Sequence, residues 1–281
     1  MLVFLLVAFV LAWVPWAAVV SLGGEPGWLS AVLQAMATFA PGVAALLVAG
    51  QASGWAGLKK VLRPLGHFRV GASWYGLALL GPPLLMAAAV GGHVALGGRP
   101  PDLPDADRWL FIPGLFVLVL LIGGPLGEEP GWRGYALPVL QRRLGSLTGA
   151  LALGLVWAVW HLPLRLIPGT PQAQVPLMLI VVQTVAVSLI LAWILSGSGG
   201  SLLLVVLAHA SLNTWAGPLR VLPVDAGSIR PYAIATAFIA ALAVPAAVKL
   251  TAKESVAASD PSWEQDNGRP PRHNGEPPDV G

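Results

Sequence analysis

Residues 109–129 read WLFIPGLFVLVLLIGGPLGEE, an uncharged run of nineteen residues that ends directly on the glutamates Glu128 and Glu129. A run of about 20 apolar residues is long enough to cross the hydrocarbon core of a membrane as a helix. Charged side chains at that depth are costly and are tolerated mainly where they face the protein interior and serve a function. This stretch therefore predicts a membrane-spanning helix that carries a carboxylate pair at its end.

The rest of the sequence has the same apolar character. Hydrophobic residues make up 56% of the 281 residues and charged residues only 10%, with a mean hydropathy of +0.74. A soluble domain carries about 25% charged residues, so this chain lacks the polar surface to face water. Besides 109–127, seven stretches have the length of a span, near residues 2–22, 29–50, 73–97, 146–166, 175–197, 200–216 and 230–249. Together they predict an all-α, polytopic transmembrane helical bundle of about eight spans.

The first stretch, residues 2–22, is interpreted as a retained span rather than a signal peptide. It has no basic residues at its start, and its length exceeds that of the usual apolar region of a signal peptide. The charged residues then orient the bundle: the basic ones follow the second stretch (Lys59, Lys60, Arg63, Arg69), sit in the turn at Arg142 and Arg143, and resume at Lys249 and Lys253. By the positive-inside rule these segments face the cytoplasm. We therefore expect a multi-pass protein of the cell membrane with both termini in the cytoplasm.

The chain divides into three parts by composition. Residues 1–108 are expected to form N-terminal transmembrane helices, and residues 109–250 a core that holds the unusual polar residues. From residue 251 to residue 281 Pro, Asp, Glu, Asn and Gly dominate, which predicts a disordered cytoplasmic tail because such a segment buries little apolar surface. The net charge of +3 is small and the basic residues are spread over several loops, whereas a nucleic-acid binder concentrates them in one patch. The sequence has no cysteine, which excludes disulfides and thiolate metal sites.

Of the five histidines, His161 and His209 lie well inside predicted spans, and Asn213 lies in the same span as His209. His209 and Asn213 are four residues apart and so project from one face of a helix. Glu128 lies 15 residues before Arg143, and His161 lies 16 residues after the neighbouring Gly145, so an antiparallel pair of helices places both at one level. These four groups are therefore expected to converge on one site.

The two glutamates are expected to play different roles. Adjacent residues on a helix diverge by about 100°. Glu129 precedes Arg133 by four residues, which is the favourable order for an ion pair within a helix. This leaves Glu128 to face the histidines. A helix that restarts with Pro130 at its first position is expected to leave both glutamates just ahead of its N-terminus.

A carboxylate, two imidazoles and an amide in a dry cavity suit hydrolysis. Glu128 can act as a general base toward water, an imidazole can orient that water, and Asn213 can donate to a developing oxyanion. The alternative is a zinc site held by Glu128, His161 and His209, which are the ligand types of a catalytic zinc centre. The residues themselves leave this choice open, and no other cofactor is indicated.

Three motifs resemble those of the CAAX-protease and bacteriocin-processing (CPBP) family of intramembrane endopeptidases. Residues 128–133 read EEPGWR and resemble its E-E-x-x-x-R motif; residues 157–161 read WAVWH and are similar to its F-x-x-x-H motif, with Trp where Phe is typical; residues 209–213 read HASLN and match its H-x-x-x-N motif. The resemblance covers roughly residues 110–216.

The resemblance implies a role for each matched residue. Residues 109–250 would be the catalytic core, with Glu128 activating the attacking water. His161 and His209 would assist Glu128 or bind a metal, and Asn213 would serve the oxyanion. Glu129 and Arg133 would support the site, and the Trp at position 157 would change only the shape of its wall.

The sequence thus predicts an intramembrane endopeptidase that cuts a membrane-associated peptide or membrane protein in the cytoplasmic half of the bilayer. Its partners would be the lipid bilayer and this substrate. Two other interpretations remain open: a non-catalytic membrane immunity or binding protein of the same fold, and a proton-coupled transporter. No motif specifies the substrate, prenylated or not, or the oligomeric state.

Overall fold

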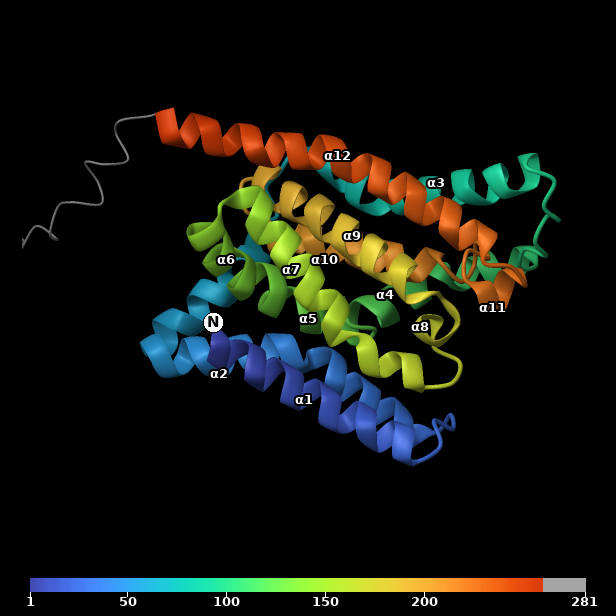
Figure 1. Ribbon diagram of the computed structural model, residues 1–281, viewed down its shortest axis with the longest axis horizontal. Helices are drawn as coiled ribbons and strands as arrows, with labels where there is room; N and C mark the ends of the chain where they lie inside the picture. The colour runs from blue at the N-terminus through green and yellow to red at the C-terminus, as the bar shows by residue number, and fades with distance from the viewer. Residues whose placement is uncertain (260–281) are drawn as a thin grey trace, which may run out of the picture.

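The computed structural model describes residues 1–259, except for the side chains of residue 106 and residues 253–259. Every regular element in this part of the chain is a helix, which confirms the predicted all-α bundle (Figure 1). The elements in chain order are α1 (Leu2–Ser21), α2 (Trp28–Leu62), η1 (Arg63–Gly66), α3 (Ala72–Ala95), η2 (Ala106–Phe111), α4 (Ile112–Ile122), α5 (Pro125–Gly131), η3 (Trp132–Ala136), α6 (Leu137–Leu144), α7 (Ser146–Trp160), η4 (Leu162–Leu166), α8 (Pro171–Gln174), α9 (Leu177–Gly197), α10 (Leu202–Trp215), α11 (Pro223–Ala226) and α12 (Arg230–Ser259). The tail predicted from residue 251 lies largely outside the described residues, and its first nine residues continue α12.

Seven helical segments in the described chain are long and apolar enough to cross a membrane: Leu2–Ser21, Trp28–Gly66, Ala72–Ala95, Asp107–Leu144, Ser146–Leu166, Leu177–Gly197 and Arg230–Ala252. The eighth predicted span, residues 200–216, is corrected to the 14-residue helix α10. At 1.5 Å per residue such a helix is about 21 Å long, which is shorter than the ~30 Å hydrocarbon core. Its ends are Ser201, which caps the helix, and Trp215.

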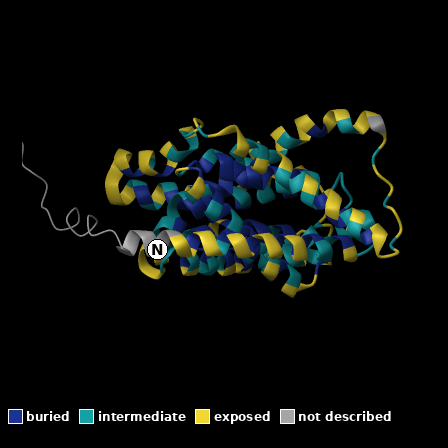
Figure 2. Ribbon diagram, turned by 90° about the horizontal axis from the view of Figure 1, so that it is seen from above, coloured by how far each residue is buried: buried dark blue, intermediate teal, exposed yellow. Residues whose placement is uncertain are grey.

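The outer faces of the bundle are apolar. Leu80, Leu118 and Val244 are 60%, 53% and 62% exposed on three different helices. Figure 2 shows exposed residues along the outer faces of the helices and buried residues toward the centre. Exposed apolar residues on this scale fit a multi-pass protein whose outer surface contacts lipid.

Helix α5, which carries the glutamate pair, packs very closely against α2. A Cβ atom added to Gly42 would lie 2.5 Å from the carbonyl oxygen of Gly127, and one added to Gly127 would lie 2.8 Å from the Cα of Phe39. A Cβ on Gly131 would likewise collide with the backbone of Pro41. Small residues at a helix interface allow backbones to approach in this way. The glycines thus fix the height and rotation of α5.

We expect Gly42→Ala to lower the thermal unfolding temperature of the protein in detergent. The added methyl group meets backbone atoms of α5 that cannot rotate away, and overpacking of this kind costs about 1–3 kcal/mol. The matched control is Gly76→Ala on α3, where an added Cβ meets nothing within 4 Å. Equal stability of the two variants would contradict a tight contact between α2 and α5.

The helix break near the glutamates lies before them rather than between them and Pro130. Gly124 has a φ of 113° and caps α5, and Pro125 occupies the first position of the helix. The helix thus starts at Pro125 and not at Pro130, and both glutamates lie within α5. Pro130 lies inside the helix, where it lacks a backbone donor, and the chain continues as one π-helical turn over Trp132–Ala136.

Candidate active site

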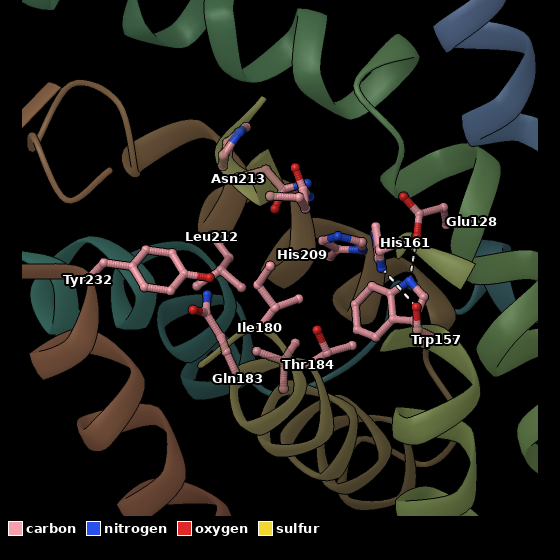
Figure 3. Close-up of a pocket in the computed structure, with 13 residues that line it drawn as sticks. Glu128, Trp157, His161, Ile180, Gln183, Thr184, His209, Leu212, Asn213 and Tyr232 are labelled. Atoms are coloured by element: carbon pink, nitrogen blue, oxygen red, sulfur yellow. Dashed lines mark hydrogen bonds between the residues drawn. The ribbon is translucent and has the colours of Figure 1, made fainter. Parts of the chain in front are cut away.

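The four predicted catalytic residues line one cavity of about 140 Å³ (Figure 3). Glu128 comes from α5, His161 from the end of α7, and His209 and Asn213 from α10. Glu128 and His209 are each only 4% exposed. Trp157 also lines this cavity, whereas Glu129 and Arg133 are absent from its described lining. The spacing argument thus placed these groups in the same part of the bundle.

Trp157 holds the carboxylate of Glu128 directly. Its indole Nε1 donates a hydrogen bond to Glu128 Oε2 over 2.8 Å (Figure 3). A phenylalanine at this position has no donor to offer. The expectation that Trp in place of Phe changes only the shape of the wall is therefore corrected, because the indole orients the carboxylate.

The ring of Trp157 also contacts the other groups of the site. The guanidinium carbon of Arg133 lies 4.3 Å from the ring centroid, in a cation–π arrangement. The imidazoles of His161 and His209 lie 5.5 and 5.3 Å from it, centroid to centroid. One buried indole thus fixes the spacing between the carboxylate and both imidazoles.

Glu129 lies behind the cavity and is fully buried. Its Oε1 accepts hydrogen bonds from Arg133 Nη1 over 3.0 Å and from His209 Nδ1 over 2.7 Å. The ion pair predicted with Arg133 is confirmed. The contact with His209 was not predicted, and it corrects the view that Glu129 serves only Arg133. Because Nδ1 of His209 is engaged by the carboxylate, Nε2 is the ring atom that remains for the cavity.

The imidazole of His161 is positioned by the backbone of the preceding helical turn. The residue caps the C-terminus of α7, so it lies at the end of the helix rather than well inside it. Its Nδ1 lies 2.9 Å from the carbonyl oxygen of Trp157. Since a carbonyl oxygen only accepts, Nδ1 donates in this contact, and the neutral ring keeps an unprotonated Nε2.

The donor set does not fit a bound metal ion in this arrangement. Within the described chain, no group of three or more His, Asp or Glu side chains converges as metal ligands do. The contacts of Nδ1 do not bear on this point, because each imidazole keeps Nε2 and a zinc-bound histidine normally donates its other ring N–H to a carbonyl or carboxylate. The zinc alternative is thus disfavoured only by the lack of convergence of these side chains.

Sequence reasoning missed several polar residues that line the cavity. Gln183 and Thr184 come from α9, Tyr232 from α12 and Gln172 from α8 (Figure 3 labels all but Gln172). Gln183 and Tyr232 are polar residues within predicted spans, and this signal goes unused when only ionisable residues and Asn are considered. Arg165 donates from Nη1 to two backbone carbonyls of the α8 segment, over 3.0 and 2.7 Å, and so ties this segment down beside the cavity.

Comparison with known proteins matches the same part of the chain. Residues 110–215 match the family model described as "Type II CAAX prenyl endopeptidase Rce1-like". The protein named "CAAX prenyl protease 2" of Methanococcus maripaludis is 28% identical over 109 residues. That alignment covers 37% of this chain and 39% of the relative, so the chain is matched to well under half of that protein. The resemblance to the CPBP family inferred from the three motifs is confirmed over these residues.

Proposed function

We propose, from the match of residues 110–215 to CAAX-type endopeptidases, that this protein is an intramembrane endopeptidase. Its substrate would be a peptide or protein held in or at the membrane. The observation that carries the proposal is the cavity where Glu128, His161, His209 and Asn213 meet from three separate helices. A polar cavity inside an apolar bundle can hold water and a peptide carbonyl apart from lipid.

Glu128 is the proposed general base. Its carboxylate takes a proton from a water molecule in the cavity while the water oxygen forms a bond to the carbonyl carbon of the peptide. The proton then passes to the departing nitrogen as the C–N bond breaks, which leaves one new carboxyl group and one new amine. The hydrogen bond from Trp157 keeps the carboxylate turned toward the cavity.

The other polar groups would serve the water and the oxyanion. His161 presents an unprotonated Nε2, which can accept a hydrogen bond from the attacking water. The side-chain amide of Asn213 can donate to the oxygen that becomes negative. His209 presents Nε2 to the cavity, because its Nδ1 is engaged by Glu129.

Helix lengths bear on the depth of the site. Glu128 lies 16 residues before Leu144, or about 24 Å along the helix axis, and His161 lies 15 residues after Ser146, or about 22 Å. The hydrocarbon core is only about 30 Å thick. His209, however, lies only eight residues, or about 12 Å, after Ser201 at the same end of the bundle, so the helices do not agree on one depth and cleavage in the cytoplasmic half remains a prediction.

The proposal is tested with purified protein in liposomes, incubated in ¹⁸O-labelled water with membrane-anchored peptides. Some of these peptides carry a prenylated C-terminal cysteine motif and others do not. We expect the wild type to produce new termini, with one ¹⁸O atom in each new carboxyl group, and Glu128→Gln to produce none. A biological effect that survives Glu128→Gln would favour a binding or immunity protein. Solute flux without a cleaved product would favour a transporter.

Chelation is expected to leave cleavage unchanged. No three His, Asp or Glu side chains converge as metal ligands in the described chain, and the proposed base is a carboxylate that acts without a metal ion. The measurement is the initial rate before and after treatment with 1,10-phenanthroline, compared with a non-chelating isomer of that compound. Loss of rate that zinc restores would contradict a metal-free mechanism.

Trp157→Phe is expected to lower kcat by about tenfold or more and to change KM little. A hydrogen bond to a charged group contributes about 1.5–3 kcal/mol, and each 1.36 kcal/mol corresponds to a factor of ten in rate. The matched control is Trp160→Phe, because the indole nitrogen of Trp160 is buried without a hydrogen-bond partner among the described residues. Equal kcat values for the two variants would show that the indole donor does not matter.

A further inference from the structure

A second cavity with polar groups, of about 370 Å³, lies between α2, α6 and α10, away from the proposed active site. Three basic residues line it, Lys60 from α2, Arg133 from η3 and Arg142 from α6, and the side chains of Lys60 and Arg142 are exposed. No acidic side chain is among its described lining residues. Much of its remaining wall is apolar, with Val61, Val139 and Leu202 among the contributors. A cationic mouth with apolar walls suits an anionic amphiphile.

The cavity opens at the basic end of the bundle. Six basic residues lie at the helix ends and turns of this side, Lys59, Lys60, Arg63, Arg69, Arg142 and Arg143, and Lys249 lies within α12. The acidic residues whose side chains the structure describes lie in the interior or at the other end, where Figure 1 shows α11 and the end of α3: Glu25, Asp102, Asp105, Asp107, Glu128, Glu129 and Asp225. The positive field around the cavity is therefore not offset by nearby described carboxylates.

Arg133 lies behind the wall of this cavity. Its side chain is fully buried, and Nη1 is taken by Glu129. Its Nε and Nη2 have no hydrogen-bond partner among the described residues, but both atoms are covered by the protein and do not face the open space of the cavity. The cationic groups that a ligand in the cavity can reach are therefore those of Lys60 and Arg142.

We propose that this cavity binds a phosphate group, carried by the headgroup of an anionic membrane phospholipid. Lys60 and Arg142, both exposed, would contact the phosphate at the mouth of the cavity. The apolar wall would receive the first carbons of the acyl chains, which favours a lipid over free phosphate as the source. Basic pockets between transmembrane helices at the membrane surface bind such headgroups.

The proposed lipid site is separate from the proposed active site. The two cavities share no lining residue among those described. Arg133 connects them, because it donates to Glu129 and stacks on Trp157 while lining the basic cavity. The lipid site stands whether or not the chain is a protease.

The test compares two double variants. Lys60→Gln with Arg142→Gln removes two charges from the cavity. Lys59→Gln with Arg143→Gln removes two exposed charges from neighbouring positions of the same helices that do not line it. Each protein is placed in nanodiscs of phosphatidylcholine with or without phosphatidylglycerol. Thermal unfolding and native mass spectrometry then report the bound lipid, because a ligand that binds the folded state raises the unfolding temperature.

We expect phosphatidylglycerol to stabilise the wild type and the Lys59/Arg143 variant and to remain bound to both in native mass spectrometry. In the Lys60/Arg142 variant its affinity should fall by about tenfold or more, which corresponds to the loss of at least one charge-assisted hydrogen bond. A further set of samples contains inorganic phosphate in place of phosphatidylglycerol. Stabilisation by phosphate alone that is abolished in the Lys60/Arg142 variant would support the same site, with a soluble phosphate as its ligand. Equal losses in both double variants would overturn the proposal, and so would a wild type that responds to neither phosphatidylglycerol nor phosphate.

Discussion

Glu128→Gln is expected to lower kcat for peptide cleavage by about 10²–10⁴-fold, the usual contribution of a general base, with little change in KM. The amide has nearly the shape of the carboxylate, and its oxygen can still accept the hydrogen bond from Trp157 Nε1. What it lacks is the ability to take a proton from water. The loss should therefore be in the chemical step and not in folding, which thermal unfolding in the same detergent checks.

The control for this variant is Glu25→Gln, which neutralises an exposed glutamate in the loop between α1 and α2. It should cleave at the wild-type rate. Single-turnover measurements separate the chemical step from binding and product release. Cleavage by Glu128→Gln at the wild-type rate would remove Glu128 from the mechanism altogether.

Glu129→Ala is expected to cost about 3–5 kcal/mol of unfolding free energy, the typical effect of breaking a buried ion pair. The change leaves the guanidinium of Arg133 buried beside a small apolar residue and removes the acceptor of His209 Nδ1. Chemical or thermal unfolding in detergent measures the loss. Cleavage should fall as well, because the imidazole of His209 is no longer held.

A second variant separates the buried charge from the packing. Glu129→Ala combined with Arg133→Met removes both charges, and replacing a buried pair by apolar residues is often close to neutral for stability. The double variant should therefore recover part of the stability that the single variant loses. Recovery of stability without recovery of cleavage would assign Glu129 and Arg133 a positioning role. A double variant less stable than Glu129→Ala alone would contradict the ion-pair argument.

Local periodicity accounts for most of what the sequence predicted correctly. The spacing of four residues fixes the Glu129–Arg133 pair and the shared face of His209 and Asn213, because both depend on one helix alone. The common level of Glu128 and His161 needs only two antiparallel helices and a tight turn. Hydropathy likewise predicts the seven long spans, whose apolar runs are longer than any buried helix of a soluble protein requires.

The remaining features depend on contacts between helices that are distant in sequence. The bond between His209 and Glu129 joins residues 80 positions apart and requires a particular rotation of α10 against α5. The direction of the Trp157 indole depends on how α7 meets α5. By composition a helix can begin at Pro125 or at Pro130, and only the positive φ of Gly124 places the break before Pro125. Composition and spacing specify none of these rotations.

The π-helical turn at Trp132–Ala136 sets the rotation of α6, which lines the basic cavity, relative to α5, which carries Glu128. A π turn holds one more residue than an α turn, and one residue corresponds to about 100° of rotation on a helix. Shortening this turn by one residue would rotate Arg142 and the rest of α6 away from the mouth of the basic cavity while Glu128 stayed in place. The chain between the carboxylate pair and the basic turn is thus intolerant of single-residue insertions and deletions, although most of it is an ordinary amphipathic helix.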